Sequence, residues 1–497
     1  MSVIKRQSIK STIYIYAGVL LGFVYTGILM PNFLSESEIG ALNLIVSYAL
    51  LFGQLGSLGF HTATVRIFPY FKDHKTGHHG FVFLSIAVSL AGFILAAVAY
   101  FLLKPWIVAK NVGDSPVFAS YIYLILPVAL FTIFFNQFDA YARGLYFSTV
   151  GSFMKEFFQR AMILLAVGLF ILELVNRDGL FILYTVALCL PTAGLVLFLI
   201  VKKEFSIRPD FQFIDKQIVR EMLRMGVYGL LTGFGVIAIA QIDRLMINFY
   251  LSESETGIYS TAFYFGTLIL MPSRAVQRIA ASVIAVAFKE NDLATIETMY
   301  KKTSLYQFML SLLLFLLLWM NVDAVFTIIP ESYKAGKYVI FFIGLSNVIV
   351  MAGGTSGSII SSSRHYAYSA WFVGIFLVMI VATNILLIPR FGITGAAAAS
   401  AISAFIYNGI QIIFVRHKWS FQPYDFRFLI LSAIALSIYF IVDQVPAFPN
   451  TYLDIAMRSA LITELFVILV YVLKISPELN QMLRENIQAV LKFRKRR

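Results

Sequence analysis

The chain has 497 residues, of which 59% are hydrophobic and only 13% are charged, and its mean hydropathy is +0.82. Since a soluble domain carries about 25% charged residues, this composition excludes a water-soluble globular protein. The net charge of +13 is expected of a membrane protein with basic cytoplasmic loops, so it does not indicate a nucleic-acid partner. The single cysteine, Cys189, excludes a disulfide framework and a cysteine-based metal site, and we expect no cofactor.

The apolar residues fall in blocks of about 20, the length that crosses a bilayer as a helix. We therefore predict an all-α, polytopic membrane protein with fourteen transmembrane helices. The first block is long enough to span and lacks a small-residue cleavage site, so it is predicted to be a transmembrane helix rather than a signal peptide. The predicted spans are 11–31, 41–64, 80–103, 117–138, 154–174, 179–201, 225–250, 258–287, 304–322, 338–360, 368–388, 394–415, 428–445 and 452–473.

Basic residues are distributed unevenly between the two sides of this predicted bundle. Of the 39 Lys and Arg residues, 29 lie on the side of the N-terminus, 6 on the opposite side and 4 within spans. The positive-inside rule then places both termini in the cytoplasm, and we expect a multi-pass protein of the cytoplasmic (inner) membrane. The basic tail, 475–497, is compatible with an amphipathic helix on the inner leaflet or with a frayed end that only sets the topology.

A short motif occurs twice in the chain. Leu34–Gly40 and Leu251–Gly257 share six of seven residues at an offset of 217, and Val201–Pro209 resembles Val415–Pro423 at an offset of 214. The repeat predicts two six-helix lobes of the same orientation, related by an axis along the membrane normal, as in transporters with a central cavity. The expected divisions are an N-terminal lobe at 1–201, a cytoplasmic linker at 202–224, a C-terminal lobe at 225–416, two further spans within 417–474, and the tail at 475–497.

The repeated Ser-Glu-Ser-Glu segments contain paired carboxylates, which suggest either catalysis in an outer loop or helix capping. Ser35 and Glu38, and likewise Ser252 and Glu255, have the S-x-x-E spacing of a capping box. We therefore predict that these residues begin the second and eighth spans. The sequence has no catalytic constellation and no phosphate-binding loop, so we do not expect an enzyme.

The most informative charges are Arg274 and Arg278, which follow Pro272 in the predicted eighth span. An ionisable residue in a span costs about 2.5–3.5 kcal/mol. The i,i+4 spacing places both guanidinium groups on one helix face, where they repel unless an acid or an anion lies between them. Two interpretations follow, an anion-binding cavity or neutralisation by carboxylates of other helices. By contrast, Arg458 is predicted to form a structural ion pair with Asp454, four residues earlier.

Further polar residues within the predicted spans extend this candidate site. Asp243 and Arg244 are adjacent, so they do not face each other on a helix, and we interpret them either as part of a gate or as interfacial residues. By the repeat offset, the two arginines of span eight correspond to Ser57 and His61 in span two. The candidate substrate-binding residues are Arg274, Arg278, Arg244, Asp243, His61, Ser57 and Gln54, and Asn136, Gln137 and Asp139 are further polar candidates.

Three segments of the chain resemble a known family. Asp243–Leu251 followed by Gly257–Ala262, and later Pro389–Ala399, look like the polysaccharide-biosynthesis oligosaccharide flippases of the lipid-linked O-antigen type. These belong to the multidrug/oligosaccharidyl-lipid/polysaccharide exporter superfamily. The resemblance covers nearly the whole chain in span count and two-lobe layout. The related peptidoglycan-precursor flippases also use charge in span one, and here that span carries none.

The resemblance implies a V-shaped carrier that moves an undecaprenyl-diphosphate-linked oligosaccharide to the outer leaflet by alternating access, for surface polysaccharide biosynthesis. In that family cationic cavity residues hold the diphosphate, a role that falls here on Arg274 and Arg278. The expected partners are the lipid-linked oligosaccharide and membrane lipids, with H⁺ or Na⁺ as candidate coupling ions, and the expected state is a monomer. One alternative is a cation-coupled drug exporter of the same fold, which would need a carboxylate in the first lobe. The other is a membrane glycan polymerase or ligase, which would need a large outer loop.

Overall fold

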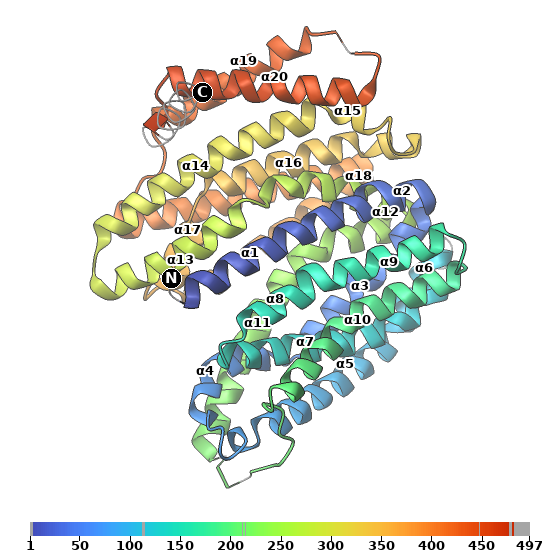
Figure 1. Cartoon of the computed structure of the whole chain (residues 1–497), viewed down its shortest axis with the longest axis vertical. Coiled ribbons are helices and arrows are strands. Elements are labelled where there is room, and N and C mark those ends of the chain that lie inside the picture. The colour runs from blue at the N-terminus through green and yellow to red at the C-terminus, as the bar shows by residue number, and fades with distance from the viewer. Residues whose placement is uncertain are drawn as a thin grey trace, which may run out of the picture. The chain divides into compact units, whose positions relative to one another are not determined.

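The computed structural model describes residues 3–111, 115–210, 212–213, 215–446, 448–476 and 480–481. These residues are almost entirely helical and include no strand (Figure 1). They contain 11 helices that are long and apolar enough to cross a membrane, or 12 if the bent pair Glu253–Leu270 and Ser273–Glu290 is one span. The all-α, multi-pass membrane fold is confirmed, and the count of fourteen spans stays a prediction. The predicted tail helix lies almost wholly outside the described residues.

Contacts divide the chain into two compact units, which are described separately. The first unit is Met1–Tyr264 with Val373–Ala399, and the second is Phe265–Phe372 with Ser400–Arg497. These units differ from the lobes expected from the repeat, and the lobe boundaries stay a prediction.

The first unit is built from long apolar helices, some of them interrupted. α1 (Val3–Gly22) continues through a π-helical stretch, Phe23–Leu29, into α2 (Met30–Phe33). A second π-helical stretch, Phe153–Phe158, joins α8 (Ser148–Ser152) to α9 (Gln159–Ile171). The other helices are α3 (Glu36–Gly56), α4 (Phe60–Phe71), α5 (Phe81–Asn111), α6 (Pro116–Tyr121), α7 (Ile125–Gly144), α10 (Arg177–Val201), α11 (Lys216–Tyr250) and α12 (Glu253–Thr267), whose last turn belongs to the second unit.

The second unit holds the helices that follow the second copy of the repeated motif. Its helices are α13 (Ser273–Glu290), α14 (Leu293–Met320), α15 (Val322–Val325), α16 (Lys337–Ala352), α17 (Ser356–Ser362), α19 (Phe426–Asp443) and α20 (Thr451–Val472). The two helices added after the repeat, α19 and α20, pack on α14 around a buried cluster that includes Leu431, Ile438 and Ile462.

One helix, α18 (Ala367–Trp419), is shared between the units and is broken inside. Gly392 has φ 59° and ψ −141°, a conformation that is essentially restricted to glycine. Pro389 lies three residues earlier. The break falls between the predicted spans 368–388 and 394–415, so the sequence placed this boundary correctly.

The two copies of the repeated motif contact each other reciprocally inside the first unit. A side-chain carbon on Gly40 would lie 1.8 Å from the Glu253 carbonyl oxygen, and one on Gly257 would lie 2.0 Å from the Glu36 carbonyl oxygen. Because Glu36 and Glu253 are equivalent in the repeat, as are the glycines, the starts of α3 and α12 cross in a locally symmetric way. Only glycine permits this backbone approach.

The capping predictions explain where these two helices begin. Ser35 and Glu38 form a reciprocal capping box at the start of α3. In the second copy, Ser252 accepts a hydrogen bond from the Glu255 amide at 3.2 Å. Glu253 accepts the amides of Val117 and Phe118 instead, and so caps the neighbouring α6. The carboxylates of the motif therefore cap the N-termini of helices.

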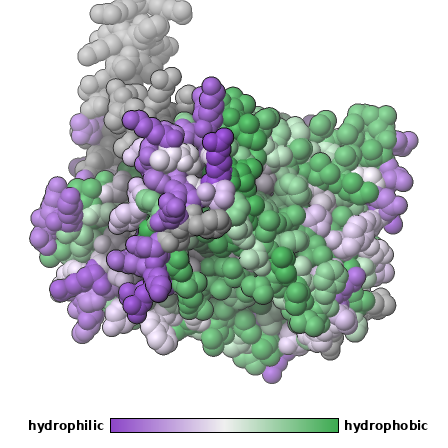
Figure 2. Space-filling view, turned by 90° about the horizontal axis from the view of Figure 1, so that it is seen from below, coloured by the Kyte–Doolittle hydropathy of each residue, from purple (hydrophilic) through white to green (hydrophobic). Residues whose placement is uncertain are grey.

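Large apolar side chains cover much of the protein surface. In Figure 2 hydrophobic residues fill the centre and much of the right of the view, and hydrophilic residues gather on its left side and along its right edge. Leu102, Trp371 and Phe405 are examples, with 75%, 73% and 67% of their surface exposed. Apolar exposure on this scale is expected of a surface that contacts lipid.

Candidate functional site

A pocket of about 410 Å³ opens in the first unit beside His61. We call it the His61 pocket. Its lining comes from four helices, α3, α4, α7 and α11, and six of its nine lining residues have polar side chains. The lining residues are Gln54, His61, Asn136, Asp139, Arg143, Thr232, Gly233, Val236 and Ile237. Four polar residues that the sequence singled out, Gln54, His61, Asn136 and Asp139, thus come together in one place.

The pocket exists because the second span is broken between α3 and α4. Gly59, in the break, has φ +66°, and a side chain there would lie 2.0 Å from the Gly226 carbonyl oxygen of α11. The Ser57 hydroxyl donates to the Gln54 carbonyl at 2.7 Å and accepts from the Gly59 amide at 3.2 Å. Ser57 is buried and holds the break together, so it is absent from the pocket lining.

Two buried polar atoms of the pocket have no hydrogen-bond partner among the described residues. They are Gln54 Nε2 and His61 Nδ1. Gly233 on α11 leaves room for the amide, because a side chain there would lie 2.3 Å from Gln54 Nε2. Leaving such groups unpaired costs about 1–3 kcal/mol each, so a polar ligand that bonded to them would recover this energy.

The charges of the His61 pocket neutralise each other. Asp139 forms an ion pair with Arg143, one turn later on α7, at 3.3 Å. Gly151 of α8 packs against this carboxylate, since a side chain there would lie 1.7 Å from Asp139 Oδ1. The pocket is therefore polar without a free charge when His61 is neutral. The sequence did not single out Arg143 or Thr232 as pocket residues, although the i,i+4 spacing of Arg143 from Asp139 was a usable signal.

Asp243 and Arg244 each have their own partners, as their adjacency on the helix predicts. Asp243 is buried and accepts hydrogen bonds from Tyr259 at 2.7 Å and Asn384 at 2.8 Å. Arg244 donates to Ser260 at 3.1 Å and to Gln241 at 3.0 Å. These bonds tie α11 to α12 and to the part of α18 that belongs to the first unit. Neither residue lines the His61 pocket.

Arg274 and Arg278 lie at the start of α13 in the second unit, directly after the break at Met271–Pro272. Both side chains are exposed within their unit. Among the described residues, neither guanidinium forms an ion pair or a hydrogen bond with a protein group. Gln277, between them in sequence, donates to the Gly354 carbonyl at 2.6 Å, so it holds α13 in place while the arginines stay available.

The helical segment from α8 to α9 carries two basic residues, Lys155 and Arg160, which lie at the start of the predicted span 154–174. Lys155 lies in the π-helical stretch Phe153–Phe158, and Arg160 lies in α9, so the helical placement of both agrees with the predicted span. Arg160 pairs with Glu156 at 3.2 Å. Its NH1 atom is buried without a partner among the described residues, and a side chain on Gly22 of α1 would lie 3.2 Å from it. The i,i+4 spacing of Glu156 and Arg160 in an apolar stretch was the signal for this arrangement.

The family model for polysaccharide biosynthesis proteins matches residues 4–288 of the chain. This match covers more than half of the sequence. The chain belongs to this family. The resemblance read from the sequence is confirmed.

A curated relative of this polysaccharide biosynthesis protein is the probable low-salt glycan biosynthesis flippase Agl15 of Haloferax volcanii. The two are 22% identical over 210 residues, which is 42% of this chain and 44% of the relative. The chain thus aligns with less than half the length of that relative.

Solved structures similar to this family member share its fold. The lipid II flippase MurJ, in an inward closed conformation, matches with a TM-score of 0.76 at 11% identity, over 94% of this chain and 98% of that chain. An inward-facing multidrug resistance MATE family transporter of the MOP superfamily matches with a TM-score of 0.64 at 15% identity, over 82% and 98% of the two chains. The MurJ- and MATE-like membrane fold is therefore established.

One histidine cluster of the family member has the composition of a metal site. His74, His78 and Glu204 bring three ligand atoms within 4.8 Å of one another. His78 Nδ1 accepts a hydrogen bond from the Asp73 amide at 3.2 Å. The ring proton is therefore on Nε2, which donates a hydrogen bond to Glu204 at 2.8 Å. A metal on Nε2 would move the proton to Nδ1, against the Asp73 amide. The arrangement therefore suits a hydrogen-bonded clamp between the loop after α4 and the segment after α10.

The same clamp has a second, partly buried contact. His79 lies 3.0 Å from Asp210 and stacks on the Phe213 ring at 3.9 Å. Its hydrogen bond to Asp210 holds the pKa of that carboxyl below the usual range. A lowered carboxyl pKa means that the contact favours the ionised form.

Proposed function

We propose that the protein is a flippase that moves an undecaprenyl-diphosphate-linked oligosaccharide across the cytoplasmic membrane by alternating access. Family membership supports a role in polysaccharide biosynthesis. The fold supports transport, because MurJ and MATE proteins share it. The flippase named among the relatives supports a lipid-linked glycan as cargo.

The observation that carries the proposal is the pair Arg274 and Arg278. Two guanidinium groups at i,i+4 repel each other by Coulomb's law, and the described residues offer them no carboxylate. Neutralisation by acids of neighbouring helices therefore lacks support. A diphosphate is a fixed anion that arginine binds bidentately, and it would relieve the repulsion. The start of α13 adds the partial positive charge of a helix N-terminus.

The His61 pocket supplies a second, uncharged polar region. Gln54 Nε2 and His61 Nδ1 are unpaired there, and both suit sugar hydroxyls, which donate and accept. We assign the diphosphate to the arginines. Asp243 and Arg244 are assigned to positioning α11, because their side chains are occupied by helix contacts.

A cation-coupled drug exporter of the same fold needs a carboxylate free to exchange a cation. The first unit has Asp139 near the end of α7, but Arg143 already neutralises it at 3.3 Å. A glycan polymerase or ligase would need a catalytic constellation, and the described residues bring none together outside the histidine clamp. Neither alternative has an observation that favours it.

The test is complementation of a deletion strain with variants of the arginines. Arg274→Gln and Arg278→Gln should each reduce surface glycan by about 10- to 100-fold, since a hydrogen bond to a charged group is worth about 1.5–3 kcal/mol. Lipid-linked precursor should accumulate, and protein level should stay normal. Lys should rescue only partly, because a point charge lacks the guanidinium fork.

Arg364→Gln is the matched control, because Arg364 is another exposed arginine of the second unit. It should export normally. Full export by a stable double Gln variant would overturn the diphosphate assignment. Loss of the protein itself in each single variant would show instead that the arginines are structural.

A further inference from the structure

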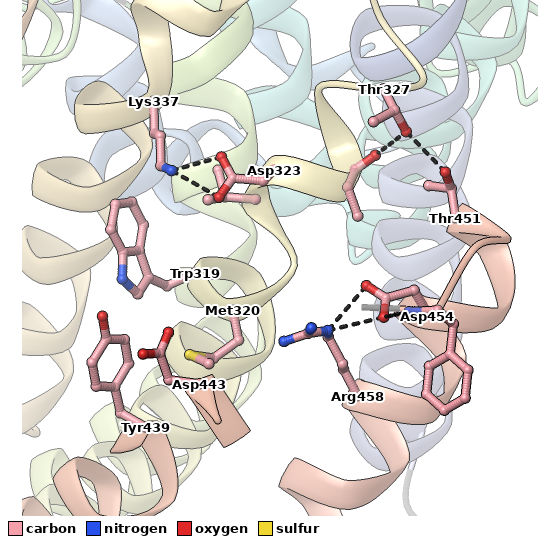
Figure 3. A pocket seen from close by; sticks show the side chains of 13 residues that line it. Trp319, Met320, Asp323, Thr327, Lys337, Tyr439, Asp443, Thr451, Asp454 and Arg458 are labelled. Carbon is pink, nitrogen blue, oxygen red and sulfur yellow. Dashed lines mark hydrogen bonds and ion pairs between the residues drawn. The ribbon is translucent and has the colours of Figure 1, made fainter. Parts of the chain in front are cut away.

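A second pocket, of about 540 Å³, lies in the second unit between the end of α14, the start of α16, and the facing ends of α19 and α20. We call it the Asp443 pocket (Figure 3). Its size falls within the range of roughly 300–1,000 Å³ typical of small-molecule sites. It contains none of the residues assigned to substrate above.

Most charges that line the Asp443 pocket are already paired. Lys337 Nζ contacts both carboxylate oxygens of Asp323, at 2.6 and 2.8 Å. Arg458 Nε contacts both oxygens of Asp454 at 3.0 Å, which confirms the predicted ion pair. Arg458 also donates to the Val445 carbonyl at 2.9 Å. The dashed lines in Figure 3 mark the two ion pairs. No cation of the pocket is left to bind an anion.

Three polar groups in the pocket have no hydrogen-bond partner among the described residues. They are the indole N–H of Trp319 at the end of α14, and the Tyr439 hydroxyl and the Asp443 carboxylate on α19. Tyr439 and Asp443 are four residues apart, so they share a helix face. In Figure 3 all three side chains project into the same pocket. The indole N–H is a hydrogen-bond donor, the Tyr439 hydroxyl can donate and accept, and the Asp443 carboxylate is a strong acceptor.

The chemistry of these groups selects the charge of the ligand. Counting Asp323, Asp443 and Asp454 against Lys337 and Arg458, the pocket carries one net negative charge, which disfavours a phosphate or an acidic sugar. The ring of Trp319 already has Lys337 Nζ 5.7 Å from its centre, which disfavours a second cation there. A neutral ligand with several hydroxyls meets neither obstacle.

We infer that the Asp443 pocket binds a neutral sugar unit. The aromatic rings of Trp319 and Tyr439 offer apolar faces for the C–H face of a pyranose. The sugar hydroxyls would donate to Asp443 and accept from the indole N–H. The two ion pairs hold the pocket walls, and the Thr327 hydroxyl, which donates to the Ala324 carbonyl at 2.8 Å, holds the loop after α15.

The identity of the bound sugar rests on the proposed function. If the protein exports a lipid-linked glycan, a sugar of that glycan is the expected occupant. A free sugar would use the same contacts. The binding measurement below requires no transport, so its outcome is separate from that of the arginine variants.

The experiment titrates the purified full-length protein with neutral methyl glycosides of glucose, galactose and N-acetylglucosamine, and follows tryptophan fluorescence. At least one glycoside should give a saturable change. Asp443→Asn should weaken that binding by about tenfold, because it removes the charge-assisted hydrogen bond. Trp319→Phe should abolish the fluorescence change. Pyrophosphate and ethanolamine, titrated in parallel, should give none.

Two controls match these variants. Glu331→Gln removes an exposed carboxylate of the same unit that pairs with Lys334, and Trp371→Phe removes a tryptophan that is 73% exposed and outside the pocket. Both should bind like wild type. In the complemented deletion strain, reduced export by Asp443→Asn would identify the exported glycan as the source, and unchanged export would identify a free sugar.

Three outcomes overturn the inference. They are the absence of saturable binding to every glycoside, equal affinity of wild type and Asp443→Asn, and preferential binding of pyrophosphate or ethanolamine. Each leaves the arginine assignment untouched. Conversely, full export by a stable double Gln variant of the arginines would overturn the diphosphate assignment without affecting sugar binding to the Asp443 pocket.

Discussion

The helices that begin at the two copies of the repeated motif, α3 and α12, are each followed by a break, and the two breaks differ in construction and in charge. In the first repeat, α3 runs for 21 residues to Gly56, and the break is made by glycine in a left-handed conformation at Gly59. In the second, α12 runs for 15 residues into a three-residue 3-10 turn, and Pro272 precedes α13. The first break opens onto a neutral polar pocket, and the second is followed by two unpaired arginines.

The difference in length changes which residues are equivalent. Both helices begin at the repeat offset of 217, Glu36 against Glu253, but α4 begins at Phe60 and α13 at Ser273. Counted from the start of the second half-helix, His61 therefore corresponds to Arg274 rather than to Arg278. The distance from the start of the first helix to the start of the second is about one helical turn shorter in the second copy. This shift changes which residue of α13 is equivalent to His61, and both copies keep a broken helix. One backbone device, a break in the helix that follows the repeated motif, thus carries neutral polar groups in one copy and cationic groups in the other.

The largest effect is expected from filling the first break. Gly59→Ala places a methyl group 2.0 Å from the Gly226 carbonyl oxygen and forces a left-handed conformation on alanine. We expect a loss of about 2–5 kcal/mol in stability, from the conformation and from overpacking. Thermal unfolding of the purified protein measures it. Gly168→Ala is the control, because nothing lies within 4 Å of the added carbon. A Gly59→Ala protein that melts like wild type would contradict the role of this glycine.

The next largest effect is a difference in export between variants at the two breaks, one of which is charged. Arg274→Gln should reduce export by about 10- to 100-fold, whereas His61→Gln should change it by less than about threefold, because an amide retains the hydrogen bonding of a neutral imidazole. Export per molecule of protein, measured in the complemented deletion strain, gives the ratio. Equal losses at the two positions would mean that the positive charge is not what distinguishes the second break.

Pro272→Ala should have a smaller effect. Its φ of −64° and ψ of −29° suit alanine, so stability should change by no more than about 1 kcal/mol. Export should fall a few-fold, if at all, because the 3-10 turn before it still interrupts the helix. Thermal unfolding and export in the same strain provide the measurements. A large loss of export at unchanged stability would assign the proline a role in movement rather than in shape.

The smallest effect concerns the loop after the first broken helix, which His79 ties to Asp210. The lowered pKa of Asp210 means that this contact contributes stability above the usual carboxyl pKa of about 3.9, and loses it as the pH falls through the lowered value. The melting temperatures of wild type and Asp210→Asn should therefore differ slightly at pH 5 and converge on further acidification. A difference that widened toward pH 3 would contradict the sign of the shift.

Several features could be predicted from the sequence because they depend on neighbouring residues. Twenty apolar residues in a row predict a spanning helix without reference to any other part of the chain. A capping box closes between residues three positions apart, so Ser35 and Glu38 were identified correctly. The ion pair of Asp454 with Arg458 lies within one turn of α20. The break at Gly392 followed from a gap between two apolar blocks.

Other features were decided by contacts between distant residues. Asp243 is bonded to Asn384, 141 positions later, which no local pattern could indicate. The surroundings of Arg160 depend on α1, because its NH1 atom is buried 3.2 Å from where a side-chain carbon on Gly22 would lie. The Asp443 pocket joins the end of α14 to α19 and α20, more than 100 residues further on.

The membrane class, the family and the positions of the capping residues are therefore predictable from the amino-acid sequence, since hydropathy, motifs and helix ends are local properties. Which charges are paired depends on the packing of helices that are distant in the sequence. Asp139, Asp243 and Arg160 have partners, and Arg274 and Arg278 have none among the described residues. The physical reason is that the energy of a buried charge depends on its neighbours in space, and a helix sequence specifies only those within one turn.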